Sequence, residues 1–289
     1  MAVPSVDLGL LVVLLILLSV AAGLVGSLVG MGGGVVVIPA LVVLFGVPIP
    51  EAIGTGAITI LATSTTTGAA YIRDRLTDLR MGMFLEIATV PGAVIGATAT
   101  VFLTRASLTD ALLVALGVVL LAIIPSSLAR RGQEDPTPRP PDARSRALRL
   151  SGRFVDRATG KAVSYHAADT SPALGVSFGA GIVSGMFGIG GGVFKVFALE
   201  RYMGVPMKVA TATSNFMIGV TACAGAGILF AAGYVNPLIA APVALGTAVG
   251  AYVGSQVLPG LRNRTIRWIF IPVVAALAIE TILRGVGLP

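Results

Sequence analysis

One basic residue interrupts a strongly apolar stretch in the second half of the chain. Lys195 follows a run of three glycines, Gly190, Gly191 and Gly192, and its neighbours in the sequence are valine and phenylalanine. A lysine inside an apolar segment points to function, because a charge away from water is costly to keep. Such a lysine could bind an anion. The alternatives are that its side chain reaches the aqueous surface or pairs with Glu200.

The glycine run occurs twice. Gly32, Gly33 and Gly34 form the first copy, and residues 30–56 align without a gap on residues 188–214, with 12 identities in 27 positions. Three consecutive glycines tend to break a helix, and the N–H groups that open the next helix can then bind an anion. Glycine in apolar helices also allows close helix packing, which remains an alternative.

Hydroxyl and amide side chains follow each glycine run and could donate hydrogen bonds to an anion. Thr55 and Thr213 occupy equivalent positions of the repeat, and Ser214 and Asn215 come directly after Thr213. Bonding to their own helix or to a neighbouring helix is the alternative. That alternative is favoured for the hydroxyl run Thr63, Ser64, Thr65, Thr66 and Thr67.

Residues for catalysis are missing from the apolar segments. The single histidine, His166, lies in a polar stretch, and no aspartate lies in the core of an apolar segment. This excludes serine–histidine, zinc and aspartyl sites there, so we expect no enzyme, no metal site and no cofactor. Glu86 lies within an apolar segment but close to Arg80, and we interpret it as an interface residue.

The composition indicates an integral membrane protein. Of 289 residues, 55% are hydrophobic and only 11% charged, against the roughly 25% charged that is usual in soluble domains. Apolar stretches recur, five on each side of one polar gap, at 8–29, 31–47, 52–72, 81–104, 108–128, 173–188, 189–204, 209–232, 237–258 and 267–283. The stretches before and after the second glycine run are short for a crossing, which needs about 20 residues.

The repeat and the loop charges together predict the topology. Because each copy has five segments, the second copy should be inverted relative to the first. We therefore predict an all-α polytopic membrane protein of two inverted repeats, residues 1–129 and 173–289, with glycine-broken helices meeting near the midplane. Basic residues concentrate in the polar gap, which places the 130–172 linker in the cytoplasm, both termini outside, and nucleic acid among the excluded partners. Within the linker, alternation around Ala158, Thr159 and Gly160 suggests a β-hairpin.

The glycine motifs resemble those of the TauE/SafE sulfite exporter family, also called the 4-toluene sulfonate uptake permease superfamily. The resemblance rests on GLVGSLVGMGGGVVVIPAL in the first half, and on GMFGIGGGVFKVFAL and GVPMKVATATSNFMIGVTA in the second. It spans roughly 8–128 and 173–283. One departure is Phe197, where the first copy has Pro39.

The resemblance implies a permease for sulfite, sulfonates or related organic anions in the cytoplasmic membrane. From the residues alone we expect an anion, bound between the two glycine breaks and moved by alternating access. Besides the anion and the lipid bilayer, a second copy of the chain is a candidate partner. The alternatives are a channel-like anion pore, and a non-transporting assembly or signalling protein that acts through its basic linker.

Overall fold

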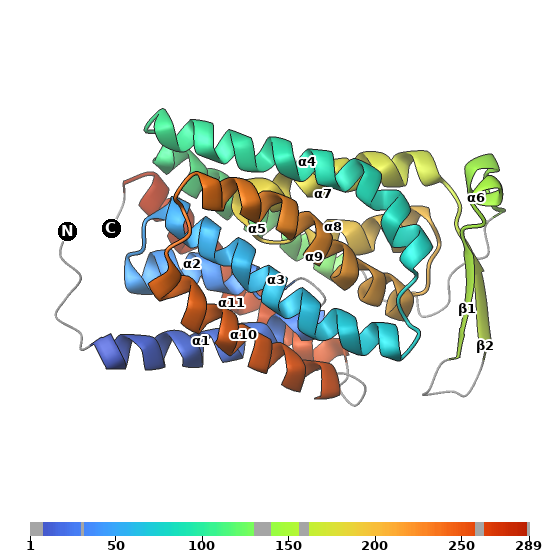
Figure 1. The fold of residues 1–289 in the computed structure, drawn as a ribbon, viewed down its shortest axis with the longest axis horizontal. Helices are drawn as coiled ribbons and strands as arrows, with labels where there is room; N and C mark the ends of the chain where they lie inside the picture. The colour runs from blue at the N-terminus through green and yellow to red at the C-terminus, as the bar shows by residue number, and fades with distance from the viewer. Residues whose placement is uncertain (1–7, 30–31, 130–139, 156–161, 258–262, 288–289) are drawn as a thin grey trace.

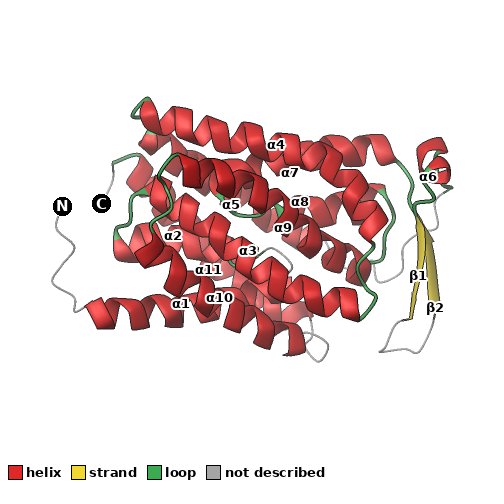
Figure 2. Ribbon diagram, in the orientation of Figure 1, coloured by secondary structure: helices red, strands yellow, loops and turns green. Residues whose placement is uncertain are grey.

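A helical bundle and one small hairpin make up the structure, a computed structural model that describes residues 8–29, 32–129, 140–155, 162–257 and 263–287. The helices run side by side, and the hairpin lies beyond one end of the bundle (Figures 1 and 2). In the first half the helices are α1 (Leu8–Val29), α2 (Gly34–Phe45), α3 (Ile49–Arg73), α4 (Leu79–Arg105) and α5 (Thr109–Ala129).

The second half begins with a shorter and more broken set of elements. Its helices are α7 (Thr170–Phe187), α8 (Gly192–Phe197), a π-helical turn η1 (Ala198–Tyr202), α9 (Met207–Ala231), α10 (Pro237–Val257) and α11 (Asn263–Gly285). Each of the ten apolar stretches therefore contains helix. Four described helical spans are long and apolar enough to cross a membrane: Gly9–Ser27, Leu79–Arg105, Met207–Ala231 and Pro237–Gln256.

The first helix of each half packs against the fourth helix of the other half. α1 lies on α10, and α4 lies on α7 (Figure 1). Glycines allow both approaches, since a Cβ on Gly23 would overlap the Thr247 carbonyl, and one on Gly181 would overlap the Thr89 carbonyl. These four residues are equivalent pairs of the sequence repeat. Close helix packing is thus what Gly23 and Gly181 provide.

The third helices of the two halves, α3 and α9, pack against each other in the middle of the bundle. Gly54, near the start of α3, lies against the carbonyl of Tyr234, just beyond the end of α9. Ser64, farther along α3, donates a hydrogen bond to the carbonyl of Asn215, near the start of α9. The two helices therefore run antiparallel.

The linker contributes α6 (Ala143–Ala147) and two antiparallel strands, β1 (Ser151–Val155) and β2 (Ala162–His166). The strands pair where the sequence suggests a hairpin. Tyr165 donates a hydrogen bond to Asp78 at the start of α4, with 3.1 Å between Oη and Oδ2. Phe154 joins Tyr165 in an apolar cluster with helix residues such as Met81. This packing supplies the support that an isolated two-stranded hairpin lacks.

Candidate functional site

The Lys195 side chain is completely buried in the bundle, at 0% exposure. Its ammonium donates hydrogen bonds to the Met217 carbonyl, at 3.2 Å, and to the Thr221 hydroxyl on α9. It also lies 3.5 Å from the Glu86 carboxylate on α4. The alternative that Lys195 reaches the aqueous surface is therefore wrong.

Glu86 is part of the same buried arrangement and is only 4% exposed. The Thr221 hydroxyl lies 2.9 Å from Glu86 Oε1 and also accepts a hydrogen bond from Lys195, so it bridges the two charges. We call Lys195, Glu86 and Thr221 the Lys195 cluster. The interpretation of Glu86 as an interface residue is wrong, because its carboxylate is buried within the bundle and pairs with Lys195.

The cluster is energetically demanding. A buried ion pair gains little net stability over an apolar core, but removing one partner leaves an uncompensated buried charge that costs about 3–5 kcal/mol. A membrane bundle retains such a pair where it has a functional use. The cluster is therefore the strongest candidate for the centre of the site.

The second glycine run explains how Lys195 comes to lie inside the bundle. Gly188, Gly190 and Gly191 have φ angles of 61°, 80° and 61°, in the left-handed region that favours glycine. A Cβ on Gly188 would lie 2.5 Å from the Ile53 carbonyl oxygen, and one on Gly191 would lie 2.5 Å from that of Ala180. The chain thus turns tightly against α3 and α7 before α8 starts at Gly192.

The two glycine runs lie against each other. A Cβ on Gly34 would lie 2.6 Å from the Gly188 carbonyl oxygen, and Gly32 takes a positive φ of 73°. Gly33 caps the start of α2, as Gly191 caps the start of α8. The helix breaks of the two halves are therefore neighbours in the bundle.

The four hydroxyl and amide candidates take different positions. Ser214 lies at the glycine break, where its Oγ donates to the Gly192 carbonyl at 3.2 Å. Asn215 bonds within α9, from Nδ2 to the Thr211 carbonyl. Thr213 faces α4 and accepts a hydrogen bond from the Asp78 N–H at 2.9 Å. Thr55 is fully buried, and its hydroxyl has no hydrogen-bond partner in the described part of the chain.

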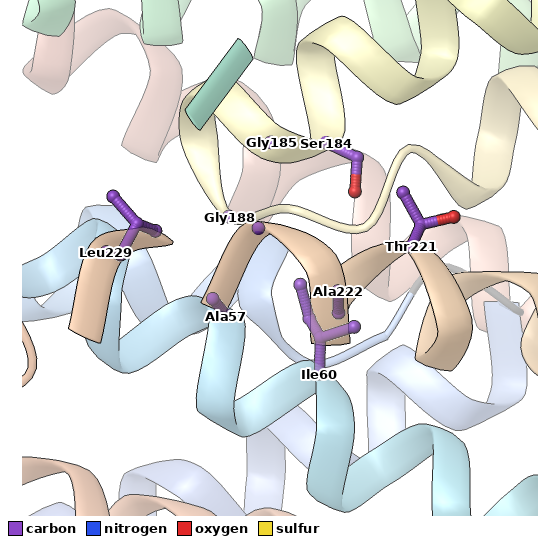
Figure 3. A pocket seen from close by; sticks show the side chains of 9 residues that line it. Ala57, Ile60, Ser184, Gly185, Gly188, Thr221, Ala222 and Leu229 are labelled. Carbon is purple, nitrogen blue, oxygen red and sulfur yellow. The ribbon is translucent and has the colours of Figure 1, made fainter. Parts of the chain in front are cut away.

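A small cavity lies beside the cluster, between α3, α7 and α9 (Figure 3). Thr221 belongs both to the cavity wall and to the cluster. Ser184 of α7 adds a second hydroxyl, and the space holds about one water molecule. The remaining lining residues are Ala57, Ile60, Gly185, Gly188, Ala222, Gly225 and Leu229.

The sequence is similar to those of known membrane proteins. The model of the sulfite exporter TauE/SafE family matches residues 15–281. The chain belongs to this family. It is 30% identical over 285 residues to the probable membrane transporter protein YunE of Bacillus subtilis. The alignment covers 95% of this chain and 98% of the relative.

Other relatives of this TauE/SafE protein carry similar names. The probable membrane transporter protein YdhB of Bacillus subtilis is 25% identical, over 84% of this chain and 89% of the relative. The probable membrane transporter protein MamO of Paramagnetospirillum magneticum is 26% identical, over 92% of this chain but only 44% of the relative. No solved structure matches. The TauE/SafE resemblance is confirmed, and the protein is a multi-pass membrane transporter.

Sequence reasoning about this TauE/SafE protein missed the partner of Lys195. Glu86 lies 109 residues earlier in the chain, on a helix of the other half. The available signal was charge complementarity, because Glu86 and Lys195 are an acid and a base that each stand within an apolar stretch. The cavity wall contributed by Ser184 and Gly185 had no such signal.

Proposed function

We propose that this transporter is a permease that exports sulfite, sulfonates or related organic anions across the cytoplasmic membrane. One observation carries the proposal: a fully buried lysine lies just after the glycine break of the second half. A small anion offers this ammonium a partner of the right sign, and the two glycine runs, each followed by a helix, lie against each other.

The anion would lie between the two glycine breaks, near Lys195. Ser214 is already at the break, and the unpartnered Thr55 hydroxyl is available to donate to an oxyanion. The N–H groups at Gly32, Gly33, Gly34, Gly190, Gly191 and Gly192 would add further donors. In this proposal Thr213 and Asn215 support the site through α9. Thr213 bonds to Asp78, and Asn215 bonds to Ser64 and Thr211.

Alternating access fits this interior better than an open pore does. The cavity beside the cluster holds about one water molecule, and Lys195 is fully buried, so the site would have to open towards one side to exchange an anion. The antiparallel α3 and α9, and the reciprocal packing of α1 on α10 and α4 on α7, support the two halves as inverted repeats.

The orientation is part of the proposal. The hairpin lies at the end of the bundle opposite to the start of α1 and the end of α11 (Figure 1). Together with the basic residues of the linker, this supports a cytoplasmic linker and termini on the outer side.

The test compares anion binding in two variants that differ only at Lys195. Glu86→Gln removes the internal carboxylate, and the double variant Lys195→Met with Glu86→Gln also removes the cation, so neither keeps an unpaired buried carboxylate. Sulfite, 4-toluenesulfonate and methanesulfonate should raise the unfolding temperature of Glu86→Gln in detergent, and should not raise that of the double variant.

In liposomes, Glu86→Gln should also show flux of a labelled anion, and the double variant should not. The matched control is Lys208→Met on the exposed surface at the start of α9, which should behave as the unmodified protein. Equal binding and flux in both Glu86 variants would exclude Lys195 from the site. Absence of flux for every anion in the unmodified protein would overturn the permease.

A further inference from the structure

We infer that Glu86 carries a proton through the transport cycle, because the transported anion displaces its carboxylate from Lys195. The inference rests on the proposed anion permease and adds the coupling ion. In the structure Glu86 occupies the side of Lys195 that an anionic substrate would need, at 3.5 Å from the ammonium.

Substrate and Glu86 compete for one cation. The ammonium has three donor protons, and the structure directs it at the Met217 carbonyl, the Thr221 hydroxyl and Glu86. The first two acceptors are neutral and belong to α9. An anion that binds Lys195 therefore replaces the one negatively charged partner, which is Glu86.

A displaced Glu86 carboxylate would be left at 4% exposure without a counter-charge. A buried carboxylate in that position takes up a proton, since the neutral acid is far cheaper to bury than the ion. Among the described residues, the elements packed around it supply no second cation at this depth. α7 has no titratable side chain, and α9 carries only Lys208 in its first turn and the exposed Cys223.

The remaining charged and titratable groups on the neighbouring elements lie away from the cluster, towards the ends of the helices. They are Asp78 and Arg80 at the start of α4, Arg105 at its end, Glu200, Arg201 and Tyr202 in η1, Tyr71 and Arg73 at the end of α3, Glu51 at its start, and Asp110 at the start of α5. When the anion takes the place of Glu86 beside Lys195, the Glu86 carboxylate therefore has to bind a proton.

The proton balance of one cycle follows directly. On the side where the site is open, the anion binds the Lys195 ammonium and a proton from water bonds to a Glu86 carboxylate oxygen. On the other side, the anion leaves, the O–H bond of Glu86 breaks, the proton returns to water, and the carboxylate pairs again with Lys195. Thr221 joins Glu86 to the cavity, where about one water molecule fits.

One proton and one anion therefore travel in the same direction. A monovalent sulfonate moves without net charge, whereas a divalent anion moves with one net negative charge. An inside-negative membrane potential drives that negative charge outward, which agrees with the proposed export of a divalent anion.

The experiment measures how many protons move with each transported anion. It uses anions that carry no proton themselves. Protein in liposomes with the potential clamped at zero receives labelled 4-toluenesulfonate or methanesulfonate, whose acids are fully ionised, while a trapped pH dye reports internal acidification. We expect about one proton per anion in the unmodified protein. If only sulfite is moved, the count is the difference between the unmodified protein and Glu86→Gln at equal flux.

Glu86→Gln is the decisive variant, because the amide resembles the protonated acid and cannot release a proton. It should retain exchange of labelled for unlabelled anion across the membrane, lose net proton movement, and lose the dependence of exchange on pH. The matched control is Glu280→Gln near the end of α11, where Glu280 pairs with Arg284 at the surface, and it should keep the proton count.

Several results would overturn the inference. Anion flux without proton movement in the unmodified protein would remove the coupling and leave the permease intact. Protons that still move in Glu86→Gln would show that another group carries them, and a folded Glu86→Gln without exchange would make Glu86 part of the anion site only. If Glu86→Gln does not fold, the proton count of the unmodified protein still decides. No flux of any anion would overturn the permease itself.

Discussion

Equivalent residues of the two halves differ in their hydrogen bonds. Thr213 accepts a hydrogen bond from the Asp78 N–H, whereas the hydroxyl of its counterpart Thr55 is buried without a partner in the described residues. A buried hydroxyl that makes no hydrogen bond costs about 1–3 kcal/mol. In a transporter, such a group is a natural donor to a bound anion.

We therefore expect Thr55→Val to separate stability from binding. The change keeps the shape of the side chain and removes the unsatisfied hydroxyl, so it should leave the unfolding temperature in detergent unchanged or raise it by a few degrees. The affinity for sulfite or a sulfonate should fall about ten- to a hundredfold, because one hydrogen bond to a charged ligand is lost. Ligand-dependent thermal stabilisation measures both quantities.

Thr59→Val is the matched control one turn along α3. The Thr59 hydroxyl bonds to the Thr55 carbonyl at 2.8 Å and so has a partner within its own helix. Anion affinity should stay unchanged there. An unaltered affinity in Thr55→Val as well would exclude Thr55 from the site.

The helices use glycine in two ways. In the two runs, positive φ angles let the chain turn sharply, as at Gly190 and Gly191. Within regular helices, the lack of a side chain lets two backbones approach, as at Gly185, where a Cβ would overlap the Ala93 carbonyl of α4. The same α7 also carries Gly179, around which a Cβ would meet nothing within 4 Å.

Two alanine substitutions on α7 should therefore act in opposite directions. Gly185→Ala forces α7 away from α4 and should destabilise the protein by about 1–3 kcal/mol. Gly179→Ala adds a side chain in open space and should be neutral or stabilising by about 0.5–1 kcal/mol. Unfolding in detergent followed by circular dichroism measures the difference. Equal stability of the two variants would mean that α4 and α7 do not rely on this close approach.

On the scale of the whole molecule, the halves are interlocked and the linker is attached to them. The first helix of each half packs mainly on the fourth helix of the other half, α1 on α10 and α7 on α4. The linker is attached through Tyr165, which bonds Asp78, and through Asp142, which accepts hydrogen bonds from the Thr170 hydroxyl and N–H at 2.5 and 2.9 Å.

Attachment of the linker should depend on pH through Asp142. Burial opposes the charged form of this carboxylate, but the hydrogen bonds from Thr170 and from the Ser145 N–H outweigh that effect and hold its pKa below the ordinary value. A carboxylate with a lowered pKa contributes stability above its unfolded pKa of about 3.9 and loses that contribution as the pH falls through its folded pKa.

At pH 5 we expect pepsin to cleave the linker of Asp142→Asn faster than the linker of the unmodified protein. The ratio of the two cleavage rates should fall towards one as the pH falls through the lowered pKa of Asp142 in the folded protein. A ratio that does not change with pH would show that the charge of Asp142 does not hold the linker. Comparing the two proteins at each pH corrects for the activity of the protease itself.

The sequence by itself determined the membrane class, the ten apolar segments, the duplication and the positions of the two glycine breaks. Hydropathy, helix length and the repeat are properties of consecutive residues, and they can be read without knowing which helices touch. Lys195 could be named as a candidate for the same reason, because the sequence alone shows a lysine among valines and phenylalanines.

Only the tertiary structure decided what Lys195 faces. Its pairing with Glu86 depends on the rotation of α4 and α8 about their axes, and on the packing of α4 against the second half. Neither is encoded in a short stretch of sequence, since the energy of a buried charge depends on partners that folding brings together from distant positions. For the same reason the sequence could name Thr55 and Thr213 as equivalents but could not show that only one of them lacks a partner in the described fold.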